Sequence, residues 1–426
     1  MSGPGFCFEN TLHYSSPAHG DWGIVRVAML VPESYQLFVC PFACGRHGAI
    51  GAMQHGFKDR MSYLYVDQND IINGYDDLIF DAVGELFAAL APARPKVLLI
   101  FVSCLDDLIG TDHASLAARL SAKYPGVRFR DCHMNPIALD SSVPPGISVQ
   151  NKMYSLLESG SSGAGERDAA VNSIGNFDAI DPGSELRVFL ENYGVGELRH
   201  ISGYETFDSY QRMGRSRLNL VVNPAGLQAA GQMENSLGIP FIFLPVAYRM
   251  ENVAQNYRLL GRALGGDDST PPDLSVFESE ARGAARAALS AVGDLPVIVD
   301  DSAVTRPFEL ARALVEYGFN VARVVTGECA PPDEENMRWI LDSAPEIGIV
   351  QPEHHNSIKF DLRMGRSLAV GLDGAYLAGS DYLLDMLNDA GMYGYYGVTS
   401  LMTRMAKAVR RKADLRAVID SYGLVI

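Results

Sequence analysis

The sequence predicts an α/β protein with parallel sheets flanked by helices. Short apolar runs rich in Val, Ile and Leu alternate with amphipathic stretches from about residue 95 onward. Continuous apolar strands separated by helices are typical of parallel sheets that are covered on both faces. The chain has 426 residues, and at about 150 residues per domain this length allows two or three compact units.

The repeating element is a strand, a helix and a further strand, which is the Rossmann-like unit. The run 96–104 (KVLLIFVSC) is apolar almost throughout and predicts a buried strand, which a helix over 112–123 follows. The same order recurs twice. The first recurrence has a strand over 218–223 (LNLVVN), a helix over 225–237 and a strand over 238–245. The second has a strand over 295–300 (LPVIVD), a helix over 306–317 and a strand over 320–326.

Two turn-rich segments divide the chain into three Rossmann-like domains and a tail. The run 159–165 (SGSSGAG) suits a flexible linker, and 265–272 (GGDDSTPP) precedes a helix over 275–292. We expect the basic helix over 399–416 to pack back onto the first domain. The predicted domains are 1–165, 166–290 and 291–375, with a C-terminal extension over 376–426.

The charge and hydropathy of the chain exclude several classes of partner. The net charge is −16, whereas nucleic acids and anionic membranes require basic patches on the proteins that bind them. The longest apolar stretches are far shorter than the about 20 residues of a spanning helix. The first ten residues (MSGPGFCFEN) lack the parts of a signal peptide. We therefore expect a soluble, cytoplasmic protein with no nucleic-acid and no membrane partner.

Three of the six cysteines form a pattern that suggests metal chemistry. Cys104 ends the strand 96–104, and Cys40 and Cys44 share the short segment 40–48 (CPFACGRHG), which we read as a loop. Two thiolates in a loop and a third at a strand end could cradle an iron–sulfur cluster. Zinc or a redox pair of thiols fits this spacing as well, and so does coincidence. Cys132 and Cys329 are expected to be buried core residues, and Cys7 is left unassigned.

The surroundings of these cysteines resemble the nitrogenase component 1 superfamily. The segment 101–112 (FVSCLDDLIGTD) is similar to the family signature in which a cluster Cys precedes an Ile-Gly-Asp-Asp motif. Trp22-Gly23 and the segment 40–48 resemble the family stretch that ends in a second cluster Cys, at the position of Cys44. The interval of 104 − 44 = 60 residues is close to the family's usual gap. The pattern N-P-A-G…M-E-N-S-L-G-I-P-F over 223–241 is similar too.

The departures from the family pattern limit what the resemblance implies. Where nitrogenase α subunits have a further cluster Cys upstream, this chain has Pro17, Ala18 and His19. The resemblance therefore implies a 4Fe–4S or P-cluster-like group at a subunit interface. It would have either an unusual ligand set of Cys40, Cys44 and Cys104 or a fourth ligand from a partner chain. The neighbourhood 222–224 has no thiol for a molybdenum–iron cofactor. The chain thus resembles a β-type subunit or a simple-cluster reductase.

The function that this resemblance implies is that of an oxidoreductase subunit. It would receive electrons from an ATP-dependent iron protein, work with a second component 1-like subunit in a hetero- or homo-oligomer, and reduce a small substrate. Cleavage of C–S bonds in methylthio-alkanes and reduction of a tetrapyrrole both fit. Two alternatives are a non-catalytic scaffold for metallocluster assembly and an α/β binding protein whose thiols are incidental.

Three histidines and two aspartates are candidates for further roles. His47 could tune the cluster by hydrogen bonding, and His354 and His355 could donate protons to a substrate or form a structural pair. No P-loop motif is present, so we expect the partner to bind the nucleotide and this chain to bind none. Asp106 and Asp107 are read as carboxylates at a helix N-terminus.

Overall fold

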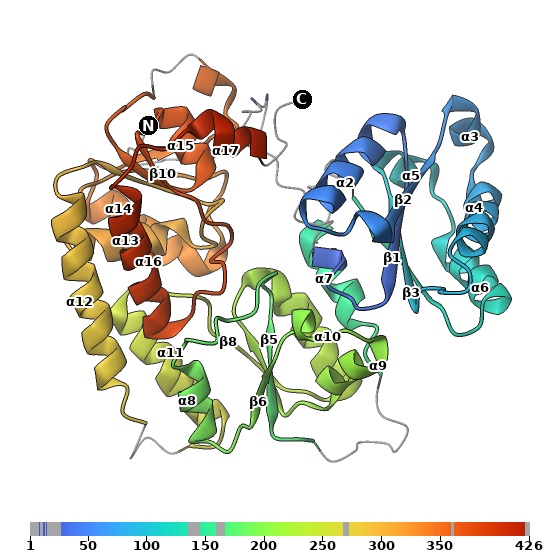
Figure 1. Cartoon of the computed structure of the whole chain (residues 1–426), viewed down its shortest axis with the longest axis horizontal. Coiled ribbons are helices and arrows are strands. Elements are labelled where there is room, and N and C mark those ends of the chain that lie inside the picture. Colours follow the sequence, from blue (N-terminus) through green and yellow to red (C-terminus); the bar gives the residue numbers. More distant parts are fainter. Residues whose placement is uncertain are drawn as a thin grey trace. The chain divides into compact units, whose positions relative to one another are not determined.

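The structure is an α/β fold with three parallel sheets, which confirms the predicted fold class (Figure 1). The computed structural model describes Phe8, Leu12, Tyr14 and the ranges 27–134, 145–158, 167–266, 272–358 and 362–421. The chain divides into two compact units. The N-terminal unit comprises Trp22–Phe177 and Glu197–Phe243 and holds two sheets, and the C-terminal unit comprises Met1–Asp21, Asp178–Gly196 and Leu244–Ile426 and holds the third.

The first sheet has the strand order β2-β1-β3-β4, and all of its pairs are parallel. Its two central strands, β1 and β3, are buried on both faces. Val97, Leu99 and Phe101 of β3 join one core with α7, whereas alternate residues of the same strand join a second core with α4 and α6. The elements are β1 (Ser34–Cys40), α2 (Phe42–Gln54), β2 (Met61–Tyr65), α3 (Gln68–Asn73), α4 (Asp76–Ala89), β3 (Val97–Val102), α5 (Cys104–Ile109), α6 (His113–Lys123), β4 (Arg128–His133) and α7 (Pro145–Tyr154).

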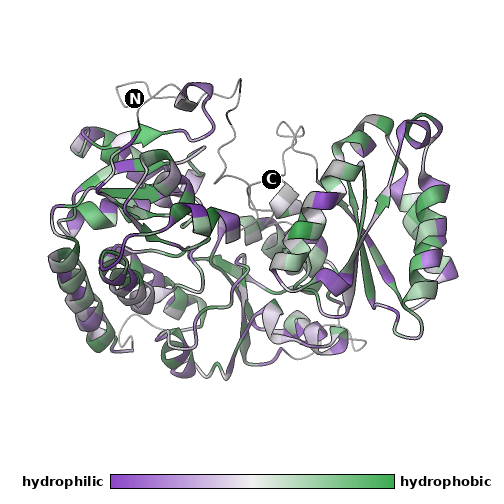
Figure 2. Cartoon of the chain, turned by 45° about the horizontal axis from the view of Figure 1, so that its top comes forward, coloured by the Kyte–Doolittle hydropathy of each residue, from purple (hydrophilic) through white to green (hydrophobic). Residues whose placement is uncertain are grey.

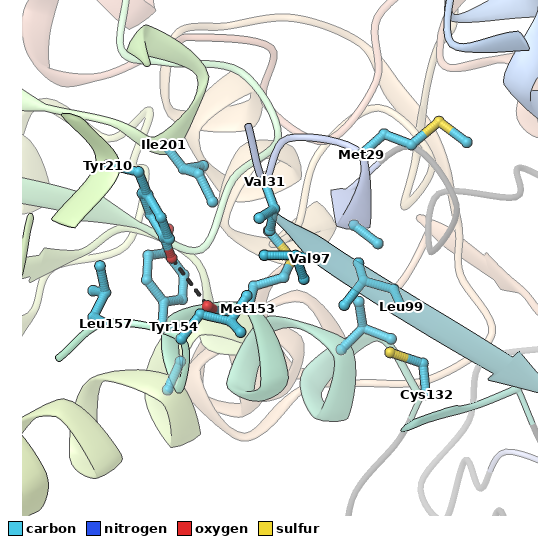
Figure 3. Close-up of a cluster of buried hydrophobic side chains, with 14 of the residues drawn as sticks. Met29, Val31, Val97, Leu99, Cys132, Met153, Tyr154, Leu157, Ile201 and Tyr210 are labelled. Carbon is cyan, nitrogen blue, oxygen red and sulfur yellow. Dashed lines mark hydrogen bonds between the residues drawn. The ribbon is translucent and has the colours of Figure 1, made fainter. Parts of the chain in front are cut away.

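The second sheet has the order β6-β5-β7-β8, again with parallel pairs. Its core is continuous with that of the first sheet, because α7 packs against both β4 and α10. Figure 3 shows this shared core, in which the Tyr210 hydroxyl donates to the Met153 carbonyl at 3.0 Å. The elements are β5 (Ala170–Ile174), β6 (Glu197–Arg199), α9 (Phe207–Tyr210), β7 (Leu218–Val221), α10 (Leu227–Leu237) and β8 (Phe241–Phe243).

The third sheet has five parallel strands in the order β11-β10-β9-β12-β13. Its last strand lies beyond residue 375, where the sequence placed a domain boundary. The elements of the C-terminal unit are α8 (Leu186–Glu191), α11 (Met250–Ala263), α12 (Ser275–Val292), β9 (Val297–Asp300), α13 (Pro307–Glu316), β10 (Val321–Val325), α14 (Glu334–Ser343), β11 (Gly348–Val350), β12 (Leu368–Val370), α15 (Leu372–Ala378), β13 (Tyr382–Leu384), α16 (Gly394–Ala408) and α17 (Leu415–Ser421).

The basic helix predicted over 399–416 is two helices. α16 ends at Ala408 and α17 begins at Leu415. Between them, the amide of Ala413 donates to the Asp381 carbonyl, and the Lys412 ammonium pairs with the Asp381 carboxylate at 3.0 Å. α16 packs along α12 in the C-terminal unit.

Longer helices of both units, such as α4 and α16, are amphipathic, and Figure 2 shows hydrophobic and hydrophilic residues mixed along the helices. Seven residues of α16 are buried, while Lys407 is exposed. Among the residues that the structure describes, no helix is long and apolar enough to cross a membrane.

The buried carboxyl of Asp300 makes the stability of the C-terminal unit depend on pH. Asp300 ends β9 and accepts hydrogen bonds from the amides of Ser302 and Gly374 at 2.7 and 2.6 Å. Burial, with a smaller effect from the charge of Asp301, raises its pKa to about 7. The folded protein therefore holds this proton more tightly than the unfolded chain, whose Asp pKa is about 3.9.

We expect the free energy of unfolding to fall as the pH rises from about 4 to about 7, by up to about 1.4 kcal/mol per pH unit from this group alone. Asp300→Asn should flatten this slope, and Asp342→Asn at an exposed site should not. Urea unfolding followed by the fluorescence of Trp339, the sole tryptophan after Trp22→Phe, measures it. An unchanged slope in Asp300→Asn would contradict the assignment.

Candidate metal centre

The three predicted ligand cysteines meet at the carboxyl edge of the first sheet. Cys40 is the last residue of β1, and Cys104 begins α5 directly after β3. The register pairs Val39 with Val102, so Cys40 lies beside the chain that leads into Cys104. Cys44 lies in the first turn of α2, and it interacts electrostatically with both Cys40 and Cys104.

The segment 40–48 is not the loop that the sequence suggested. β1 runs to Cys40 and α2 begins at Phe42, so Cys44 is held by regular helix. Gly45 and Gly48 explain how this helix fits. A Cβ atom at Gly45 would lie 2.7 Å from the Tyr63 ring, and one at Gly48 would lie 3.1 Å from the end of Met61. These glycines let α2 pack closely on β2.

Burial favours the protonated forms of Cys40 and Cys44 in the metal-free protein. Burial, and to a smaller extent the charge of Cys44, raises the pKa of Cys40 to about 12. Burial and the neighbouring Cys104 also raise the pKa of Cys44, although a backbone hydrogen bond opposes this. A reactive redox cysteine needs a lowered pKa, so this environment disfavours a redox pair of thiols.

The spacing of the thiols also disfavours a single zinc ion. Two thiolates on one Zn²⁺ lie no more than about 4.6 Å apart, because each Zn–S bond is about 2.3 Å long. Among the described residues, the three sulfur atoms do not form a group within 4.8 Å of one another. An iron–sulfur cluster accepts a wider spacing, because each thiolate binds a different iron atom.

Ser103 provides a further observation that fits a cluster. Its side chain is buried, and its hydroxyl has no hydrogen-bond partner among the described residues. Leaving a buried hydroxyl unpaired costs about 1–3 kcal/mol. Because Ser103 directly precedes Cys104, a sulfide or thiolate of a bound cluster is an acceptor of the right kind for it. The residues at this edge therefore fit an iron–sulfur cluster.

The other predicted residues are placed as follows. His47 lies on α2, but its side chain is outside the described part of the structure, as is all of Cys7. His354 and His355 belong to the C-terminal unit, where their rings stack at 4.4 Å. The Nδ1 atom of His355 is buried without a hydrogen-bond partner among the described residues. Their role as proton donors stays a prediction.

The sequence did not reveal the polar group on the other side of α5. Asp106 lies in the first turn of α5, the position expected of a helix N-terminal carboxylate, and it is also 1% exposed. The side chain of Asp107 lies outside the described part of the structure. Asp106 accepts hydrogen bonds from the Tyr75 hydroxyl at 2.6 Å and from His113 Nε2 at 2.5 Å. Burial alone would raise the pKa of Asp106, but hydrogen bonds from His113, Tyr75 and Thr111 lower it overall.

Comparison with known proteins identifies the family. The family model of the nitrogenase component 1 type oxidoreductases matches residues 21–410. The chain therefore belongs to this family, which confirms the resemblance seen in the sequence. Members of the family bind iron–sulfur clusters, typically work with an iron protein and form oligomers.

Individual relatives are distant. The nitrogenase iron-molybdenum cofactor biosynthesis protein NifE of Clostridium pasteurianum is 20% identical over 259 residues, which cover 59% of this chain and 55% of NifE. The match thus spans about half the length of that protein. A structure of nitrogenase Cp1 at pH 6.5 matches with a TM-score of 0.71 and 15% identity, covering 96% of both chains. Another, at pH 5, has a TM-score of 0.59 and 14% identity, covering 90% of this chain and 87% of its own. These likenesses concern the fold.

Proposed function

We propose that this chain is the cluster-binding subunit of a nitrogenase-like oxidoreductase. Cys40, Cys44 and Cys104 hold an iron–sulfur cluster, either a 4Fe–4S cluster or one like the P-cluster. The meeting of these three thiols at one sheet edge, in a chain of the component 1 family, is the observation that supports this most strongly. A bound cluster of this kind accepts and passes on single electrons.

The protein's contribution is to supply thiolates in an apolar setting. Cys40 is fully buried within the core of the first sheet, and Cys44 packs against that core. Because the pKa of Cys40 is about 12, loading a cluster must release its proton. The same apolar surroundings exclude water from one side of the cluster. A cytoplasmic location follows, because free thiols are kept reduced there.

A partner subunit completes the site in this proposal. Three thiols leave one iron of a cubane without a cysteine from this chain. Phe42 is 60% exposed and Tyr65 54% exposed, and both lie on elements that carry or adjoin the thiols. Exposed apolar side chains grouped in this way are typical of protein interfaces. A second component 1-like subunit covering this edge would bury them and supply the fourth ligand.

The source of electrons is an ATP-dependent iron protein. The chain has no P-loop motif of its own, so a partner must hydrolyse the nucleotide. The electrons would reduce a small substrate, either by C–S cleavage in a methylthio-alkane or by reduction of a tetrapyrrole.

Anaerobic purification from a host that assembles clusters tests this proposal. We expect about four iron and four sulfide atoms per cubane and an EPR signal after reduction by dithionite. With a matching iron protein and ATP, the complex should then turn over its substrate catalytically. Iron-free protein from such a host would refute cluster binding.

The second candidate is a scaffold on which a metallocluster is assembled. The similarity to NifE, a cofactor biosynthesis protein, favours it. A scaffold would contain the same iron and sulfide but would reduce no substrate catalytically. It would instead transfer its cluster to an apo-acceptor protein, so measuring turnover and transfer on one preparation separates the two functions.

A further inference from the structure

We propose that Asp106, His113 and His133 form a second metal site, which takes one divalent transition-metal ion such as Zn²⁺ or Fe²⁺. Each residue offers one ligand atom, and the three atoms lie within 4.8 Å of one another. No other group of three potential ligands this close occurs among the described residues. Two imidazoles and one carboxylate are the donors that such ions prefer, with open positions left for solvent.

This site is separate from the thiols, although it is close to them in sequence. Cys104 and Asp106 lie on the same short helix, α5. Residues two apart on a helix point about 200° from each other, so the two side chains leave α5 on opposite sides. β4 shows the same division. Cys132 joins the core with α7, whereas Phe129 joins the core with α4 and α6, and His133 shares the face of Phe129 because strand residues alternate.

The first sheet brings the three ligands together from distant positions. Val102 at the end of β3 pairs with His133 at the end of β4. Asp106 follows β3 on α5, and His113 is the first residue of α6. The rings of His113 and His133 lie 5.4 Å apart and nearly perpendicular. All three side chains therefore meet above the carboxyl edge, where α/β sheets bind ligands.

Neighbouring groups hold the ligands in the way that metal sites require. The Tyr75 hydroxyl binds Oδ1 of Asp106, which leaves Oδ2 for an ion. Asp131 lies 3.3 Å from Nε2 of His133 and is itself anchored by the Lys152 ammonium at 2.9 Å. Carboxylates that orient ligating histidines are typical of metal sites, and removing one usually weakens metal binding about 10–100-fold.

Charge and access also suit an ion. The ionised Asp106 supplies one negative charge, while Asp131 is neutralised by Lys152. The His113 side chain is 12% exposed and that of His133 37% exposed, so an ion and its water ligands can reach the site. In the metal-free protein, His113 hydrogen-bonds to Oδ2 of Asp106 at 2.5 Å, and the incoming ion replaces this bond.

Titration of the full chain with Co²⁺ tests the proposal. Co²⁺ takes the same nitrogen and oxygen ligands as Zn²⁺, and its visible absorption distinguishes them from thiolates, which add an intense sulfur-to-metal band. We expect one equivalent of Co²⁺ to bind without the thiolate band. His133→Ala should weaken this binding about 100-fold or more, and Asp131→Asn about 10–100-fold. His55→Ala, in the same unit, is the matched control and should bind normally.

Iron and sulfide are measured in the same samples. They should be equal in wild type and in His133→Ala, so a failure of cluster binding and a failure of this site remain distinguishable. Co²⁺ that binds only with the thiolate band, or with equal affinity in wild type and His133→Ala, would overturn the proposal and leave Asp106 and His113 as a hydrogen-bonded pair.

Discussion

Replacing Cys104 by serine is expected to reduce the iron and acid-labile sulfide of the anaerobically purified protein from about four atoms each per cluster to nearly none. Cys104 is the first residue of α5, beyond the carboxyl end of β3, where the proposed cluster would bind. Serine is nearly the same size, but its hydroxyl does not ionise near neutral pH and is a poor ligand for iron. Cys44→Ser should have the same effect.

Cys329→Ser is the matched control, because Cys329 is a partly exposed cysteine in the C-terminal unit. It should keep its iron in full. Circular dichroism must show that all three variants are folded, so that the loss of iron reports on the ligand alone. Full iron content in folded Cys104→Ser would remove this residue from the ligand set.

Gly371→Ala is expected to destabilise the C-terminal unit by about 3–6 kcal/mol, because it combines backbone strain with steric overlap in a packed core. Gly371 links β12 to α15 with φ of 116°, a conformation that side chains with a Cβ atom rarely adopt. A methyl group here would also overlap the carboxylate of Asp300, which is fully buried.

Gly365→Ala separates the two causes. Gly365 also has a positive φ, of 61°, but nothing lies within 4 Å of its added Cβ, so it should cost only about 1–2 kcal/mol. In the double variant Asp300→Ala/Gly371→Ala, part of the loss should be recovered, because the overlapping carboxylate is gone. The measurement is urea unfolding followed by Trp339 after Trp22→Phe. Equal losses for Gly365→Ala and Gly371→Ala would contradict the steric part of the explanation.

The central strands of the sheets could be predicted because their sequences fit only a strand that is buried on both faces. β3, β7 and β9 are short apolar runs that are buried on both faces, and such runs are typical of parallel sheets. β4 could not be predicted in this way, because its sequence RFRDCH carries charges toward the sheet edge. The segment 40–48 does not predict α2, because it contains two glycines and glycine disfavours helix. The glycines of α2 allow it to pack closely against Tyr63 and Met61 of β2. These two residues lie outside the segment 40–48, so that segment alone does not reveal the packing.

The candidate sites differ in the same way: the residues of one lie in local sequence motifs, and those of the other do not. Cys44 and Cys104 could be found because each lies in a local motif that resembles a family signature. Asp106, His113 and His133 are separated by 7 and 20 positions, and no local pattern connects them. They become neighbours only because β3 pairs with β4. The break between α16 and α17 was equally hidden, because it depends on contacts with the distant Asp381.

The shared core of the N-terminal unit has a consequence for biosynthesis. The residues that pack against Phe38 and Val97 extend through α7 to Met233 and Ile239. A ribosome-bound chain that has emerged only as far as β4 contains all three thiols of the proposed cluster site. It still lacks the residues of α7 and of the second sheet that complete the core next to these thiols. The sheet edge therefore gains its final shape only after roughly another hundred residues have left the ribosome, about 5–20 s later at ordinary translation rates. A cluster at the proposed site would therefore be inserted only after the chain has emerged beyond Ile239.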